Sequence, residues 1–256
     1  MVPFDALGFH FLNEDEFVDT LGLLVDEGQR RPCRSGFYIC WEREGIELWY
    51  GFYDESRFGG SITPFFYTEG QPISFRVTDV HEDPEYPFDG FLVGDVNALI
   101  DVEGVRSGDY PMCVQMVDFR CALDRLEQSG LLSIRAVAFA GDLVLFEGLE
   151  ELRRYTKGID PVLAEIAPRT FLPVGLFPDP EEESSAPQPV ALLTGYLRRI
   201  HPRRNPLTGH PFYHMIVDTQ GQRLDVLSAD PVLAEARPNQ LLFCTAWMAA
   251  RMRHEP

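Results

Sequence analysis

Residues 177–189 read FPDPEEESSAPQP, and this stretch divides the chain into two parts. It combines four prolines with an acidic run and small polar residues. Such a composition cannot bury a core and favours an extended linker. We therefore predict an α+β domain over residues 1–176, a Pro/Glu-rich linker over 177–189 and a small domain over 190–256.

The two parts also differ in charge. The chain of 256 residues has a formal net charge of −18, but residues 191–256 hold 8 basic and 5 acidic side chains. The acidity therefore belongs to the N-terminal part, and it argues against nucleic-acid binding by the whole surface because phosphates would be repelled. Strong acidity commonly serves solubility, and a protein partner with a basic surface is the sharper alternative.

The composition predicts a globular, soluble and cytoplasmic protein. Apolar residues make up 45% and charged residues 24% of the chain, as in ordinary globular domains. The apolar runs are too short to span a bilayer, and the N-terminus lacks the pattern of a secretion signal. An odd number of cysteines without a C-x-x-C pair indicates reduced thiols rather than a structural zinc site, at Cys33, Cys40, Cys113, Cys121 and Cys244.

The C-terminal part has the pattern of a small β domain. Strands are predicted at 191–201, 211–219, 223–228 and 241–252, with a short helix at 230–236 before the last strand. The hexamer DPVLAE that begins this helix also occurs at 160–165, and in both copies it reads as an Asp cap followed by Pro at the first helical position. The order resembles an oligonucleotide/oligosaccharide-binding (OB) barrel, although a clear fifth strand is missing.

The N-terminal part contains two stretches with similar patterns, residues 7–53 and 110–148. Each reads as a strand, a capped helix and two further strands, with Asn13 and Asp118 as the helix caps. We therefore predict an α+β fold with a mixed, mostly antiparallel sheet and two packed helices, followed by the OB-like barrel. A genuine internal pseudo-repeat would lie in these two stretches rather than in the repeated hexamer.

The paired pattern resembles the modules of glyoxalase-like, vicinal-oxygen-chelate proteins, in which the first and last strands of two modules hold a divalent metal. The resemblance implies His10, Glu47, Gln115 and Glu147 as ligands. Such a set suits a divalent metal with open positions for a substrate oxygen. The alternative is structural, because a histidine in an aromatic strand is commonly a core residue and either glutamate could face solvent.

A basic cluster in the C-terminal part is the second candidate site. Cations beside aromatic rings are the combination with which an OB-like barrel binds single strands. The alternative is a solvated hairpin tip, or a surface that docks on the acidic N-terminal part. The cluster consists of Tyr196, Arg198, Arg199, Arg203, Arg204, Phe212 and Tyr213.

Signatures of common hydrolases, nucleotide-binding loops and metalloproteases are absent from the sequence. Stretches such as TGYLRRIHPRRNPLTGHPFYHMIVD and SGDYPMCVQMVDFR resemble a family of bacterial proteins to which no activity is assigned. We therefore predict a non-catalytic binding or interaction protein of bacterial origin, with no cofactor and no assigned catalytic residue. The alternatives are a glyoxalase-like, metal-dependent lyase, isomerase or dioxygenase, and single-stranded nucleic-acid binding through the C-terminal barrel.

Overall fold

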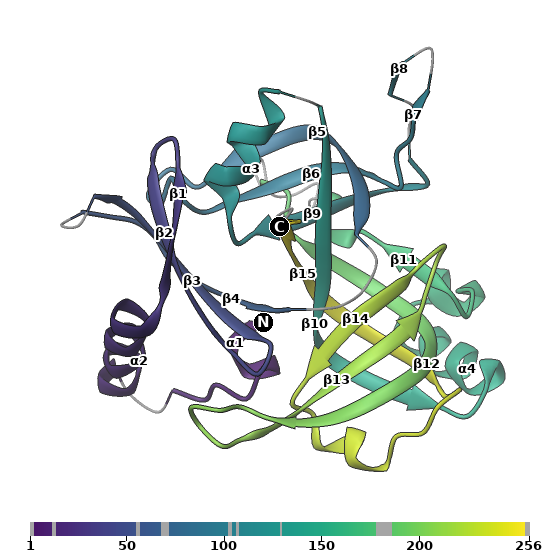
Figure 1. The fold of residues 1–256 in the computed structure, drawn as a ribbon. Helices are drawn as coiled ribbons and strands as arrows, with labels where there is room; N and C mark the ends of the chain where they lie inside the picture. Colours follow the sequence, from purple (N-terminus) through teal and green to yellow (C-terminus); the bar gives the residue numbers. More distant parts are fainter. Residues whose placement is uncertain are drawn as a thin grey trace. The chain divides into compact units, whose positions relative to one another are not determined.

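The computed structural model describes residues 3–11, 14–54, 57–67, 72–101, 104–105, 108–128, 130–177 and 186–253. Over these ranges the protein is mostly β with few helices (Figure 1). Its sheets are mixed, because most of the strand pairs are antiparallel and β9 pairs with β15 in parallel. The prediction of a mixed, mostly antiparallel α+β protein is confirmed. None of the described helices is both long and apolar enough to cross a bilayer.

The chain forms two compact units that interleave along the sequence. Unit 1 comprises Met1–Phe9, Ala138–Val174 and Val190–Trp247, and unit 2 comprises His10–Val137, Gly175–Pro189 and Met248–Pro256. The chain passes from one unit to the other inside two long strands, β10 (Leu131–Phe146) and β15 (Leu241–Met252). This division differs from the linear one predicted at residues 177–189, of which 178–185 lie outside the described residues.

Unit 1 is built around five strands whose hydrogen-bonding order returns to its starting point. The order is β12-β13-β14-β10-β15, and β12 also pairs with β15. Strand β10 of this order precedes the other four in the chain. The further elements of unit 1 are α1 (Pro3–Ala6), α4 (Leu149–Ile159), η1 (Pro161–Glu165), β11 (Thr170–Leu172), β12 (Val190–Arg204), β13 (Pro211–Asp218), β14 (Arg223–Ser228) and η3 (Pro231–Glu235); η2 (Val174–Leu176) lies at its boundary.

Alternating apolar side chains explain why these strands pack together. On β13, Met215 and Val217 are fully buried, and Val226 of β14 lies opposite Met215. The period of two places these side chains on one face of the strands. A second apolar cluster forms where α4 packs against the strand ends, from Phe146, Leu152, Ile166, Leu241 and Phe243.

The N-terminal segment is bound to the tip of the β12–β13 hairpin. Asn205 is buried, and its Nδ2 donates to the carbonyl of Leu7 at 2.9 Å. Its Oδ1 accepts the backbone N–H groups of Leu207 and Thr208, which shapes the turn. Gly8, at φ +74°, brings its backbone within hydrogen-bond reach of the Thr208 hydroxyl, at 2.7 Å. The turn sequence NPLTG therefore positions the start of the chain.

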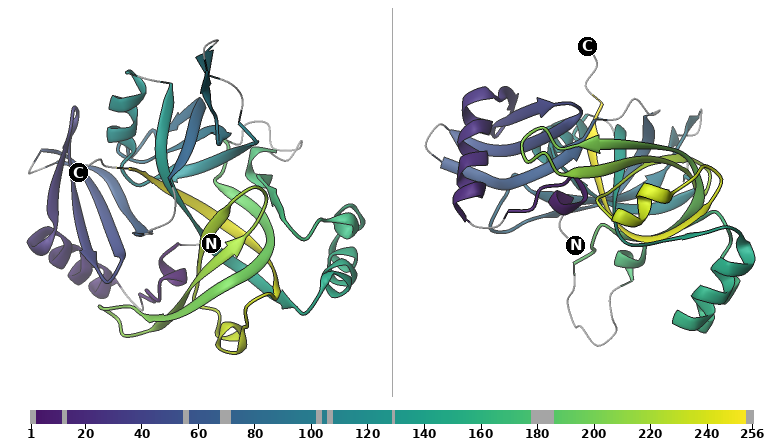
Figure 2. Two further views of the ribbon diagram at one scale, coloured as in Figure 1. Left: turned by 45° about the vertical axis from the view of Figure 1, so that its right-hand side comes forward. Right: turned by 90° about the horizontal axis from the view of Figure 1, so that it is seen from below.

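Unit 2 contains two sets of strands. Four antiparallel strands form a sheet in the order β1-β2-β3-β4, and a second set pairs β10 with β5, β5 with β6, β6 with β9, and β9 with β15 in parallel. Its elements are α2 (Glu14–Glu27), β1 (Gln29–Cys33), β2 (Gly36–Arg43), β3 (Ile46–Asp54), β4 (Arg57–Phe66), β5 (Ile73–Glu82), β6 (Gly90–Val96), β7 (Ile100–Asp101), β8 (Gly104–Val105), β9 (Tyr110–Met116) and α3 (Phe119–Leu126). Helix α2 lies along the four-stranded sheet and contacts β2 (Figure 2).

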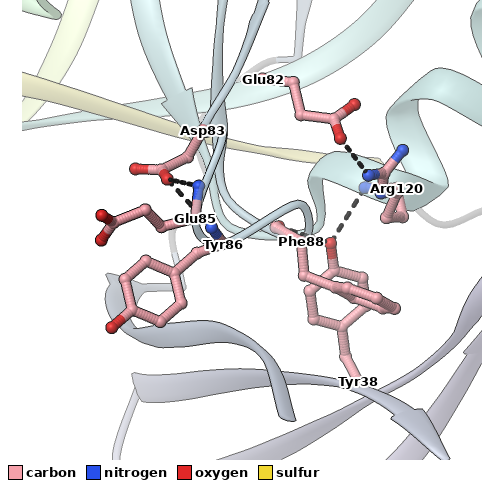
Figure 3. A network of polar contacts seen from close by, with 7 residues as sticks. All are labelled: Tyr38, Glu82, Asp83, Glu85, Tyr86, Phe88 and Arg120. Carbon is pink, nitrogen blue, oxygen red and sulfur yellow. Dashed lines mark hydrogen bonds and ion pairs between the residues drawn. The ribbon is translucent and has the colours of Figure 1, made fainter. Parts of the chain in front are cut away.

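One aromatic side chain joins the two sets of strands in unit 2. Phe88, from the loop between β5 and β6, is fully buried against glycines of the four-stranded sheet. A Cβ atom at Gly51 would lie 2.4 Å from the Phe88 Cβ, so a side chain there would displace the ring. The Tyr38 hydroxyl donates to the Phe88 carbonyl and accepts the backbone N–H of Arg120, both at 2.9 Å (Figure 3). The same loop, β2 and helix α3 are thereby held together.

The two stretches predicted to share one pattern fold differently. In the first, residues 9–11 take no regular structure where a strand was predicted, and Asn13 lies outside the described residues. In the second, the strand pair predicted after the helix is the single strand β10. By contrast, both DPVLAE copies form short 3₁₀ helices, and Asp230 caps the second by accepting the N–H of Val232 at 2.9 Å. The repeated hexamer therefore forms the same kind of short helix in both places.

Candidate ligand-binding site

The four predicted metal ligands occupy four different settings. His10 is exposed in an irregular segment, Gln115 is half-buried on β9, Glu47 is buried on β3 and Glu147 is exposed just after β10. Within the described residues, no three or more His, Cys, Asp and Glu side chains gather into a group that could hold a metal. The predicted ligand set is therefore not brought together.

Glu47 has a structural environment instead. Its side chain is 2% exposed, and its carboxylate accepts the indole N–H of Trp49 at 2.8 Å. The guanidinium of Arg251, at the end of β15, lies 3.3 Å away and rests over the rings of Phe65 and Tyr67. Burial raises the pKa of Glu47, and the Arg251 charge and the Trp49 hydrogen bond oppose that rise. Glu147 likewise accepts the amide N–H of Gln240, at 2.7 Å.

The first half of the predicted basic cluster is neutralised internally. Arg198 lies in a bulge of β12 and donates through Nε to Asp218 at 2.6 Å. Arg223 donates to the same carboxylate at 3.0 Å, and the guanidinium of Arg169 lies 3.7 Å from it. Desolvation of Asp218 would raise its pKa, but the two arginine hydrogen bonds outweigh it and the pKa is lowered. Tyr196 lies beneath Arg169 and Arg198, with both guanidinium carbons within 5.6 Å of its ring centre.

The second half of the cluster lies at the far end of the same hairpin. Arg203 is seven residues from Tyr196 along β12, which is roughly 23 Å of strand. Phe212 is only 1% exposed and cannot stack on a base, whereas Tyr213 is half-buried. Arg199 and Arg203 are exposed, and Arg204 is exposed and donates to the Gly209 carbonyl of the turn. The seven residues therefore do not form one continuous surface.

The candidate site is a cavity in unit 2 that the sequence did not indicate. It has a volume of about 570 Å³ and lies where the ends of β10 and β15 meet α3 and the start of β5. Its lining combines apolar, hydroxyl, thiol and guanidinium groups. The lining residues are Pro72, Ser74, Cys121, Arg125, Leu131, Leu132, Ser133, Met252 and Arg253.

Backbone hydrogen bonds fix the frame of the cavity. Asp118 is fully buried before α3, and both of its carboxylate oxygens accept the N–H of Met252 at 3.1 Å. Arg253 donates its N–H to the carbonyl of Ser133 at 2.9 Å, and the hydroxyl of Ser74 donates to the Ala98 carbonyl. The end of β15 is thus held between α3 and β10, which places its arginine at the mouth of the cavity.

The charges at the cavity are positive. Arg125 and Arg253 are both exposed, and the described lining includes no carboxylate. Arg125 donates to the amide oxygen of Gln128 at 3.0 Å. Because an amide carries no net charge, this contact does not neutralise the guanidinium group. The two guanidinium groups make the cavity locally positive in a protein with a net charge of −18.

The thiol on the cavity wall is one of a pair. Cys121, in the first turn of α3, lies beside Cys33 at the end of β1, and its Sγ is 4.0 Å from the carbonyl oxygen of Pro32. The interaction of the two thiols lowers the pKa of Cys33, against desolvation, and raises the pKa of Cys121 together with burial. The proton of the pair therefore leaves Cys33 first, while the thiol that faces the cavity stays protonated.

Comparison of the chain with protein-family models, with curated protein sequences and with solved structures gave no match.

The cavity residues escaped the sequence analysis for a physical reason. They come from four segments between residues 72 and 253, and none of those segments carries a motif. The arginines at 125 and 253 look like ordinary surface charges of a helix and a chain end. The pairing of β5 with β10, the contact of Asp118 with Met252 and the hydrogen bond from Arg253 to Ser133 bring them together.

Proposed function

We propose that this protein is a non-catalytic binding protein whose ligand is a small molecule with an acidic group on an apolar body. The observation that carries the proposal is the cavity of unit 2, whose lining combines Arg125 and Arg253 with the apolar side chains of Leu131, Leu132 and Met252. Its volume of about 570 Å³ falls within the range of ordinary ligand pockets, roughly 300–1,000 Å³.

The chemistry of the lining supports binding rather than turnover. Among the described lining residues there is no carboxylate or imidazole to act as a general base. The one thiol, Cys121, has a pKa raised by its interaction with Cys33 and by burial, which disfavours the nucleophilic thiolate. Guanidinium groups, in contrast, present rigid donors that match a carboxylate, sulfonate or phosphate.

Binding is tested with anilinonaphthalene sulfonate, a fluorescent molecule that joins an aromatic body to one anionic group. We expect a saturable, blue-shifted signal with one molecule bound per chain, and displacement by decanoate but not by decanol. The substitutions Arg125→Gln and Arg253→Gln should each weaken binding by about ten- to a hundredfold, because a charge-assisted hydrogen bond contributes about 1.5–3 kcal/mol.

Arg154→Gln is the matched control, because Arg154 is an exposed arginine of α4 that is not part of the cavity lining. It should leave the affinity unchanged. Equal weakening by all three substitutions would show that the affinity for the dye depends only on the overall charge of the protein. Equal competition by decanol would show that the cavity does not select an anion.

We also propose that the five strands of unit 1 whose pairing order returns to its starting point form an OB-like barrel. The support is its closed order, β12-β13-β14-β10-β15, in which β12 pairs with both neighbours. The barrel would differ from the usual order along the chain because β10 precedes the other strands. Nucleic-acid binding by this barrel is less favoured, since Phe212 is buried and Arg198 is engaged by Asp218. A cytoplasmic location, a bacterial origin and a protein partner stay predictions.

A further inference from the structure

Two cysteines that are 88 positions apart in the sequence meet beside the cavity of unit 2. Cys33 ends β1, the edge strand of the four-stranded sheet, and is followed by the turn of the β1–β2 hairpin. Cys121 is the third residue of α3. Both side chains are partly exposed, so small oxidants in solution can reach the pair.

The surrounding contacts hold the two thiols in place. The Cys121 Sγ lies 4.0 Å from the carbonyl oxygen of Pro32, the residue before Cys33. On the other side of Cys33, the N–H of Arg34 donates to Asp124 at 2.8 Å. The Arg34 guanidinium pairs with Glu127, the residue that follows the end of α3. The hairpin end is thus fastened to the helix on both sides of its cysteine.

The two thiols have different protonation chemistry. The interaction with Cys121 lowers the pKa of Cys33 despite desolvation, and the backbone N–H groups of Ser35 and Gly36 act in the same direction. A thiol with a lowered pKa is the nucleophile of a pair, and a neighbouring protonated thiol is the resolving group.

The remaining cysteines are unsuited to the same chemistry. Cys40, Cys113 and Cys244 are buried. Burial raises the pKa of Cys113 and of Cys244 to about 12, and it raises the pKa of Cys40 as well. Oxidation selects exposed thiols that ionise readily, so these three should stay reduced under mild conditions.

We propose that Cys33 and Cys121 are a site of reversible oxidation that closes into a disulfide between the β1–β2 hairpin and helix α3. The oxidant is a peroxide. The Cys33 thiolate attacks one oxygen of hydrogen peroxide, the O–O bond breaks, and Cys33 sulfenic acid and hydroxide are formed. The Cys121 sulfur then attacks the Cys33 sulfur and releases water, so that two thiols and one peroxide give one disulfide and two waters. A thiol reductant reverses the bond by exchange.

The inference does not depend on ligand binding, because the pair can oxidise whether or not the cavity takes an anion. The full-length, reduced protein is treated with a slight excess of hydrogen peroxide, alkylated and digested. We expect loss of two hydrogen atoms from the intact mass, a single cross-linked peptide that joins Cys33 to Cys121, and full recovery with dithiothreitol. Oxygen adducts without a cross-link, or a cross-link to another cysteine, would overturn the proposal.

Two variants separate the roles of the thiols. Cys121→Ser should leave Cys33 as a sulfenic acid that dimedone traps, whereas Cys33→Ser should slow peroxide consumption by at least about tenfold, since the nucleophile is lost. Cys113→Ala is the control for a thiol outside the pair, and it should form the cross-link at the rate of the unaltered protein. Equal rates in all three variants would show that peroxide reacts without selection, which contradicts the assignment.

Discussion

Asp89 is a carboxylate whose surroundings favour its neutral form. It follows Phe88 in the loop between β5 and β6, and it accepts the N–H and the hydroxyl of Ser61 at 2.7 and 2.6 Å. Burial raises its pKa from 3.8 to about 6, and the two Ser61 hydrogen bonds only partly oppose this effect. The loop that carries Phe88 into its glycine socket therefore contains a group that binds a proton more tightly in the folded state.

The pKa of Asp89 gives a signed prediction for stability. Between pH 3.8 and about 6 the folded chain holds this proton more tightly than the unfolded chain, so the contribution of Asp89 to stability falls as the pH rises through this window. The unfolding free energy falls by about 3 kcal/mol at most, because each unit of pKa difference between the folded and the unfolded chain corresponds to about 1.4 kcal/mol. Urea unfolding of the unaltered protein and of the Asp89→Asn variant, at several pH values from 4 to 7, measures it.

The amide oxygen of the Asp89→Asn variant can still accept both Ser61 hydrogen bonds, so the comparison isolates the charge. This variant should gain stability relative to the unaltered protein as the pH rises from 4 to 7. A difference in unfolding free energy that stays constant over this range would contradict the raised pKa.

Single residues also show where sequence reasoning stops. Asp118 does precede α3, as predicted, but its carboxylate makes no cap and instead binds the N–H of Met252. Glu47 was a reasonable metal ligand by residue type, yet its partners are Trp49 and Arg251. A residue type and its local spacing fix what a side chain can bind, whereas its partner can come from a segment more than one hundred residues away.

At the scale of elements, the loop between β5 and β6 is joined to the four-stranded sheet by shape. Phe88 fills a socket whose floor is glycine backbone at Gly51 and Gly59, and the rings of Tyr38 and Tyr53 meet it edge-on at 5.3 and 5.0 Å. The N–H of Phe88 donates to the Gly59 carbonyl at 2.7 Å, so the loop is held by its backbone as well. Glycine is required at both positions because a larger side chain would overlap the Phe88 ring.

Two glycine substitutions should have opposite effects on stability. Gly51→Ala places a methyl group 2.4 Å from the Phe88 Cβ and should cost about 1–3 kcal/mol, because the ring must move. Gly22→Ala, in the exposed middle of α2 with nothing within 4 Å, should stabilise the protein by about 0.5–1 kcal/mol. Thermal unfolding measures both. Similar losses in the two variants would contradict the socket.

The sequence predicted most individual elements and few of their partners. Helix 14–27, its end before Gly28 and the strand pattern from 190 onward all follow from apolar periodicity and turn residues. Two strands were predicted after the second helix, but β10 runs through this region as one strand. The pairing of β10 with β14 and β15 could not be recognised, because periodicity states which face of a strand is buried and not which distant strand lies beside it.

At the scale of the whole molecule, neither compact unit is a continuous piece of chain. Unit 1 takes three segments and unit 2 takes three others. The C-terminal strands β14 and β15 therefore pair with a strand, β10, that precedes the Pro/Glu-rich stretch. A division drawn at the composition change separates β10 from the strands with which it pairs.

This pairing predicts the behaviour of two fragments. Residues 186–253 alone should be unfolded, because without β10 the strands β14 and β15 each expose an unpaired edge. Residues 130–253, which restore β10 and α4, should unfold cooperatively with urea. Circular dichroism during urea titration distinguishes the two. Cooperative unfolding of the shorter fragment would show that β10 is dispensable.

The contact of Asn205 with Leu7 spans 198 positions, and it has a consequence for how the chain is made. At about 5–20 residues per second, roughly 10–40 seconds separate the synthesis of Leu7 from that of Asn205. Leu7 and Phe9, which are buried in the folded protein, lack this binding site throughout that interval. The segment that contains Leu7 therefore reaches its final place only after the chain has grown by a further 198 residues.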